Sequence, residues 1–265
     1  MLGKLMKYEW KATVRIFLPL YGAILLFALI TRLFWEVNNR YTPMEIPAFM
    51  SALLYSMLIL GTFAVTVFVM IQRFYKSLLG HEGYLMFTLP VQPYQHILSK
   101  LIVAFLWIVA SFLWTLLSVF FMAVSPELLY ALQAAVHSFL SQITGIGWQA
   151  LAGVLVMLLA SLAAGILMVY TASAIGHLSG RHRLLCSFAA YLGLNFAVQF
   201  LNLMVILIWA ACNSGSLFGM QPLLEINTVP LGIQLIWGFS GIYVLYAVVF
   251  FIVTNLILKR KLNLE

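Results

Sequence analysis

Long apolar stretches alternate with short polar segments along the whole chain, and this alternation predicts its elements. Six stretches are long enough for a helix that crosses a hydrocarbon core of about 30 Å, which needs about 20 residues. They cover about residues 17–35, 48–71, 101–124, 149–176, 184–212 and 234–258. We therefore expect an all-α integral membrane protein with six transmembrane helices. No repeat or long polar tract divides the chain, so one transmembrane domain is expected over residues 1–265.

Two further segments have apolar residues at helical spacing and a polar face, which predicts helices on the membrane surface. In residues 1–15 the cations fall within an arc of about 80° of a helical wheel, and apolar residues occupy the far side. These cations are Lys4, Lys7, Lys11 and Arg15. Residues 127–145 are expected to form a helix on the outer surface and not a seventh span.

The cations are sorted by position along the chain. Of its 14 Lys and Arg residues, all but Arg32 and Arg40 lie in segments separated by even numbers of predicted spans. The segments are residues 1–15, 73–100, 181–183 and 259–261. Because loops that remain in the cytoplasm retain Lys and Arg during insertion, we expect all of these segments, and both termini, to be cytoplasmic.

Composition agrees with lipid as the solvent. With 64% apolar and 8% charged residues, the chain has too little polar surface to cover a water-soluble globule. Its net charge of +7 lies at predicted membrane edges, where anionic headgroups attract it. Membrane lipid is therefore expected as a partner, and nucleic acid is not.

Few residues in the predicted spans could carry out chemistry. The chain has no Asp, and none of its 7 acidic residues falls at the centre of a span. Carriers driven by protons or sodium, and intramembrane aspartyl proteases, depend on such buried groups and are not indicated. There is no Gly-rich phosphate-binding loop, and the His residues do not have the spacing of a zinc site. We expect no catalytic residue, cofactor or metal.

One catalytic-looking match remains in the last span. Gly238-Phe239-Ser240-Gly241 superficially resembles the nucleophile motif of rhomboid proteases. Such a serine needs an imidazole within reach, and no His lies at a matching depth in another span. Helix packing through small residues is the ordinary explanation. An intramembrane serine protease, or a membrane scaffold, is the alternative function.

Two polar features lie among apolar residues. On the fifth span, Tyr191, Asn195, Gln199 and Asn202 recur at spacings of four, four and three, so they share one face. Because an unbonded amide is costly in hydrocarbon, this face is expected to meet other helices or to line a substrate path. Glu9 lies in the apolar face of residues 1–15 with no cation three or four positions away, so it either pairs with a residue from elsewhere or stays solvated.

The fourth span also has a small-residue face suited to close packing: Ala160, Ser161, Ala164 and Gly165.

The loop between the second and third spans, residues 73–100, contains the most distinctive string. Between Gly83 and Pro90 there is room for a short amphipathic helix, and exposed aromatic residues there would form a docking surface. The string Glu-Gly-Tyr-Leu-x-Phe-Thr-Leu-Pro-Val, from Glu82 to Val91, resembles the permease subunits of bacterial type-2 ATP-binding-cassette exporters. The amphipathic opening from residue 5 to residue 11 is also similar to that family, and the resemblance extends over the full length.

The resemblance implies a membrane-spanning permease subunit, not itself an enzyme, in the cytoplasmic membrane of a bacterium. It would export substrate as a dimer with a second permease subunit, powered by a separate ATPase. In that family the N-terminal helix and the loop helix seat on the ATPase, which implies coupling roles for Glu9, Glu82, Gly83, Tyr84, Phe87 and Leu89. Substrate passes between the subunits along the second and fifth spans, beside the polar stripe. An amphiphile, such as a peptide or a lipid-like antibiotic, suits a path lined by amides and aromatics.

Overall fold

The computed structural model describes residues 2–40, 45–76, 92–124, 130, 132–138, 141, 147–179, 182–212 and 228–260. Within these ranges nearly every residue is helical and none is in a strand. Six of the helices are long and apolar enough to cross a membrane. The expected all-α fold with six membrane-spanning helices is therefore confirmed.

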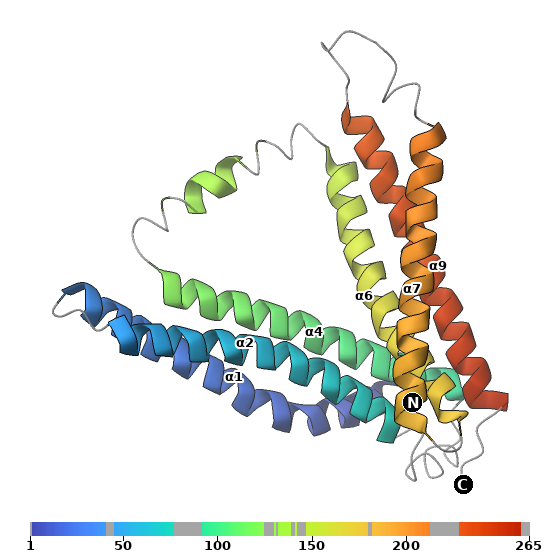
Figure 1. The fold of residues 1–265 in the computed structure, drawn as a ribbon, viewed down its shortest axis with the longest axis horizontal. Helices are drawn as coiled ribbons and strands as arrows, with labels where there is room; N and C mark the ends of the chain where they lie inside the picture. The colour runs from blue at the N-terminus through green and yellow to red at the C-terminus, as the bar shows by residue number, and fades with distance from the viewer. Residues whose placement is uncertain are drawn as a thin grey trace. The chain divides into compact units, whose positions relative to one another are not determined.

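Each long helix begins before one expected span and covers it to within one residue (Figure 1). The helices are α1 (Leu2–Arg40), α2 (Glu45–Phe74), α4 (Pro93–Ala123), α6 (Trp148–His177), α7 (Arg183–Cys212) and α9 (Thr228–Arg260). α4 begins at proline, which suits a first helical position because its missing N–H would have no partner there. In the segment expected to lie on the outer surface, residues 132–138 are helical and exposed.

α1 is one continuous helix of 39 residues, so the separate surface helix expected over residues 1–15 is not confirmed. At a rise of 1.5 Å per residue it is about 58 Å long, nearly twice the hydrocarbon thickness. The helix continues because its buried stripe stays in phase: Thr13, Phe17, Tyr21, Ile24 and Ala28 are buried at spacings of three or four. The residues before Ile16 therefore pack on the same neighbours as the span does.

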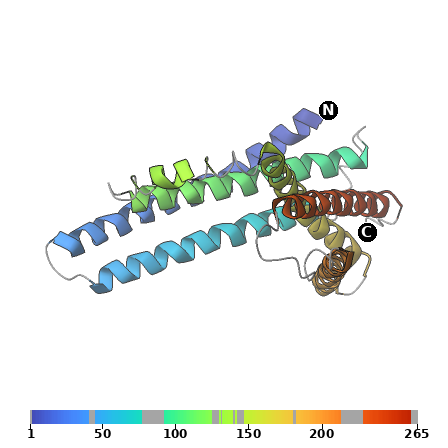
Figure 2. The ribbon, with the colours of Figure 1, turned by 90° about the horizontal axis from the view of Figure 1, so that it is seen from above.

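The helices divide into two compact units, Met1–Gln142 and Ile143–Glu265, which we call unit 1 and unit 2. In unit 1, α1 packs against both α2 and α4, and α2 also packs against α4. α1 and α4 run alongside each other in the same direction (Figure 2). The core of unit 1 is rich in aromatic residues, with Phe17, Tyr21, Tyr55 and Trp107 all buried.

In unit 2, α6 packs against both α7 and α9 through small residues. A Cβ atom added to Gly153 would lie 2.8 Å from Cγ2 of Ile236 on α9, and one added to Gly176 would overlap the backbone of Ser187 on α7. The hydroxyl groups of Thr171 and Thr254 lie 2.9 Å apart and join α6 to α9. Because glycine has no side chain, these helices can approach each other closely.

The small-residue face expected on the fourth span is only partly correct. Ala160 and Ala164 are buried, as expected. Gly165 faces open space within the described chain, and Ser161 donates its hydroxyl to the Leu158 carbonyl of its own helix. The packed face instead continues toward the end of α6, where Gly176 lies.

Candidate functional site

A buried ion cluster lies where α1, α2 and α4 meet in unit 1. Nζ of Lys100, on α4, donates to Oε1 of Glu9, on α1. Nη1 of Arg73, in the last turn of α2, lies 3.9 Å from the other carboxylate oxygen, Oε2. Of the two alternatives for Glu9, the structure shows pairing with residues from elsewhere in the same chain.

The pair between Glu9 and Lys100 is nearly withdrawn from solvent. The Lys100 side chain is 3% exposed and that of Glu9 is 11% exposed, whereas Arg73 is 33% exposed. Taking either charge out of water is expensive, and removal of one partner leaves the other buried without compensation. His96, one helical turn before Lys100, is also buried. The cluster therefore constrains how these three helices meet.

Trp107 fastens the same part of α1 to α4. Its indole ring stacks between Trp10 and Phe17, with centroid distances of 4.5 and 4.2 Å. Its Nε1 donates to Oγ1 of Thr13, 2.7 Å away, and Thr13 in turn donates to the Glu9 carbonyl oxygen. Aromatic contact and hydrogen bonding together hold residues 9–17 against α4.

Buried hydroxyl groups continue the connection along unit 1. The Ser111 hydroxyl on α4 lies 2.8 Å from the Tyr21 hydroxyl on α1 and 3.1 Å from the Thr66 hydroxyl on α2. One turn or more further, the Tyr55 and Ser118 hydroxyls lie 2.8 Å apart. These polar contacts link all three helices of unit 1. Hydrogen bonds between helices contribute to helix association in lipid.

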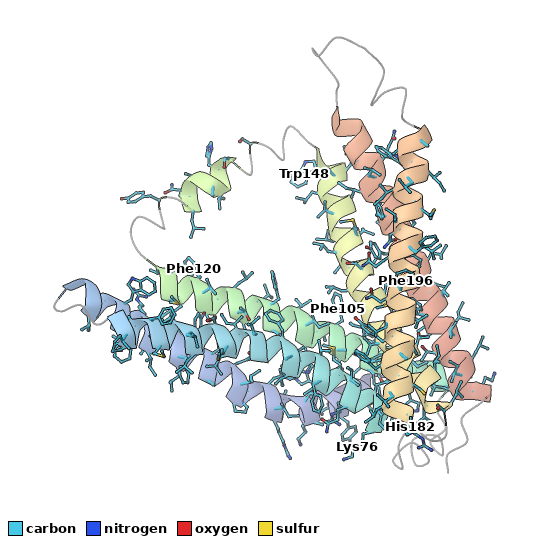
Figure 3. The ribbon with its side chains drawn as sticks, viewed as in Figure 1. Lys76, Phe105, Phe120, Trp148, His182 and Phe196 are labelled. Carbon is cyan, nitrogen blue, oxygen red and sulfur yellow. The ribbon has the colours of Figure 1, made fainter. Side chains whose placement is uncertain are left out.

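The expected coupling residues of the loop, Glu82, Gly83, Tyr84, Phe87 and Leu89, lie outside the described residues. The chain on either side of them is described. α2 ends at Phe74, two residues before Lys76, which Figure 3 labels at the end of unit 1 opposite Phe120. The two cations that approach Glu9 thus come from the helices that flank residues 77–91. Most of residues 214–232, between the fifth and sixth spans, are also outside the described residues.

The polar stripe of the fifth span is divided between two environments. Asn202 is buried, and its Oδ1 accepts a hydrogen bond of 3.2 Å from the Tyr246 hydroxyl on α9. Gln199 is exposed, and Tyr191 and Asn195 are half-buried. α7 is the least covered long helix, with 6% of its most apolar stretch buried against 22% to 33% in the other five. Asn202 therefore packs helices together, whereas Gln199 faces outward from its own chain.

Ser240 is a packed residue of α9. It is 2% exposed, and its hydroxyl donates to the Trp237 carbonyl oxygen of its own helix at 2.8 Å. This local bond is the one that serines ordinarily make in helices, and it does not activate a nucleophile. Across the parts of the chain that the structure describes, there is also no group of three side chains suited to hold a metal ion.

The sequence left open whether Glu9 pairs with another residue or stays solvated, and it did not indicate Lys100 or Arg73 as partners. The distribution of charges along the sequence could have indicated this pair. Glu9 is the only acidic residue before Glu36, and residues 92–124 contain a single Lys and no acidic residue. A lone cation at the start of an apolar helix and a lone carboxylate on an apolar face each need a counter-charge. Their pairing, across 91 positions, becomes visible only once α1 and α4 are side by side.

Comparisons of the chain with protein-family models, with curated proteins and with solved structures found no match. The residues and the geometry of the ion cluster are therefore the basis for a function. The resemblance described above rests on the opening segment and on the string from Glu82 to Val91.

Proposed function

We propose that this chain is the membrane-spanning permease subunit of an ATP-driven exporter and that a separate ATPase powers it. The observation that carries the proposal is the ion cluster, in which one carboxylate on α1 meets cations from both helices that flank residues 77–91. A coupling segment must be joined mechanically to the helices that it moves. Glu9 lies on α1 and meets cations on α2 and α4, so it links all three of these helices. The six apolar helices and the string from Glu82 to Val91 support the same function.

In the proposed mechanism, two permease subunits form the substrate path in the cytoplasmic membrane of a bacterium, with their termini in the cytoplasm. ATP binding closes two ATPases and moves the loops seated on them, and the helices re-pack from an inward-open to an outward-open state. Glu82, Gly83, Tyr84, Phe87 and Leu89 provide the seat on the ATPase.

The second permease subunit would meet this one along α7. Gln199 is exposed on that helix although an amide that lacks a partner is costly in hydrocarbon. A second subunit or a wetted path would supply its hydrogen bonds. Asn195 and Tyr191, which are half-buried, would lie beside the same path, and an amphiphilic substrate suits this mixture of amide and aromatic groups.

Purification of the full-length chain from its native membranes tests the proposal. We expect a protein with nucleotide-binding motifs to copurify and to hydrolyse ATP in the complex. Recovery of the intact chain without any ATPase, under conditions that preserve other membrane complexes, would contradict the exporter function. A covalent serine-probe signal that disappears in Ser240→Ala would support the protease alternative instead.

Substitution of Glu82 tests the seat itself. Glu82 is the only acidic residue between Arg73 and Lys100, so it either faces a cation on the ATPase or caps the short helix expected after Gly83. Glu82→Gln should cost well under about 1 kcal/mol if the role is a cap. Loss of a desolvated interface pair should cost about 2 to 5 kcal/mol and reduce ATPase association. Wild-type association and export in Glu82→Lys would show that this loop is not the coupling element.

A further inference from the structure

Glu9 contacts both of the helices whose ends bracket residues 77–91. α2 ends at Phe74 and α4 begins at Pro93, and each of these helices sends one cation to the same carboxylate. Lys100 approaches Oε1 and Arg73 approaches Oε2. One side chain of α1 therefore contacts the chain both before and after the segment.

The burial of the cluster makes this contact difficult to replace by water. An exposed ion pair contributes little because solvent screens it and its side chains lose entropy. The pair between Glu9 and Lys100 is mostly buried, and Trp107 and Thr13 pack directly beyond it along the same helices. The contact therefore continues without interruption into the core of unit 1.

We propose that Glu9 is a positioning residue that ties both ends of residues 77–91 to α1, so that displacement of this segment moves α1, α2 and α4 as one body. The inference rests on the proposed function, because it names how the coupling segment of that function is joined to the helices. Glu9 acts through Lys100 and Arg73, and its carboxylate is directed into its own chain and not toward the ATPase.

The tie is tested first on the full-length chain alone, in detergent, by exchange of the two charges. Glu9→Lys brings three cations together, and Lys100→Glu leaves two carboxylates to share Arg73. Each should lower the melting temperature by at least about 5 °C, because each leaves a buried charge without its counter-charge. The double variant Glu9→Lys with Lys100→Glu restores an opposite-charge pair. It should recover much of the loss, although Arg73 would then face a cation.

The positioning role is tested next on the complex of the chain with its ATPase, reconstituted in vesicles. Glu9→Gln and Lys100→Gln should retain ATPase association and ATP hydrolysis. Transport per ATP hydrolysed should fall by at least about fivefold, the lower end of typical coupling between two sites. Lys259→Gln is the matched control, since it removes one exposed charge at the end of α9, in unit 2, and should leave the ratio unchanged.

Four outcomes are informative. A fall in transport per ATP in both Gln variants, with rescue of stability by the charge exchange, supports the inference. Transport that falls only in proportion to the amount of folded complex shows that Glu9 serves stability alone and overturns the positioning role. Unchanged melting in Glu9→Lys overturns the tie itself. If no ATPase associates with the wild-type chain, the proposed function fails and the coupling role fails with it, whereas the melting experiment still decides whether the tie exists.

Discussion

Single polar residues in this protein have different roles that depend on what the neighbouring helix presents to them. Asn202 and Gln199 lie three positions apart on α7, yet Asn202 accepts a hydrogen bond from Tyr246 and Gln199 is exposed. In unit 1, Arg32 donates to the Phe121 carbonyl oxygen at 2.9 Å and so satisfies an acceptor near the end of α4. Side chains of the same chemical type therefore contribute differently to stability at different positions.

Substitution of the two α7 amides should separate packing from substrate contact. Asn202→Leu leaves the Tyr246 hydroxyl without its acceptor and should lower the free energy of unfolding by about 0.5 to 2 kcal/mol, measured from thermal melting in detergent. Gln199→Leu should leave melting unchanged and alter substrate-stimulated ATP hydrolysis in the complex. Equal destabilisation by both changes would show that Gln199 is also a packing residue.

The helices of the two units associate by different means. In unit 1, hydroxyl and indole hydrogen bonds link α1, α2 and α4, with Ser111 bonded to both other helices. In unit 2, glycine permits close contact of α6 with both α7 and α9. Since lipid tails are as apolar as the side chains they meet, close packing and hydrogen bonds are what remain to hold membrane helices together.

Two glycines of α6 provide a matched test of close packing. Gly176→Ala places a methyl group against the backbone of Ser187, which cannot yield as a side chain tip would, and should cost about 1 to 3 kcal/mol. Gly165→Ala meets open space and should be neutral, or stabilising by about 0.5 to 1 kcal/mol, because alanine favours helix. Melting temperatures of the two variants in one detergent decide the point. A larger loss for Gly165→Ala would contradict the packing described here.

For the whole molecule, the arrangement of three helices is similar in the two units. In each unit the first helix packs against both others, and the first and third run in the same direction. The sorted cations of the sequence predict that both termini and residues 73–100 and 181–183 are cytoplasmic.

Labelling with an impermeant thiol reagent tests this topology. In a background with Cys186 and Cys212 replaced by Ala, cysteines at Val37 and Tyr130 should react from outside intact cells. Cysteines at Lys76 and Leu178 should react only after permeabilisation. All of these side chains are exposed in the structure, so burial does not limit the reaction. Labelling at Leu178 from outside would contradict the six-span topology.

The number and approximate limits of the membrane-spanning helices follow from the sequence by itself, because the length of an apolar stretch against the bilayer thickness is a local property. The place of Glu9 on an apolar face raised the question of a counter-charge, with a solvated Glu9 as the alternative. Tertiary structure alone decided that Lys100, 91 positions away, supplies it, and that α1 continues unbroken along α4. It also decided which residue of the α7 stripe is buried. Helical spacing assigns residues to one face of a helix. It does not say what that face contacts, because a lipid tail and an apolar side chain of another helix are equally apolar. Only the packing of the helices determines which of the two the face contacts.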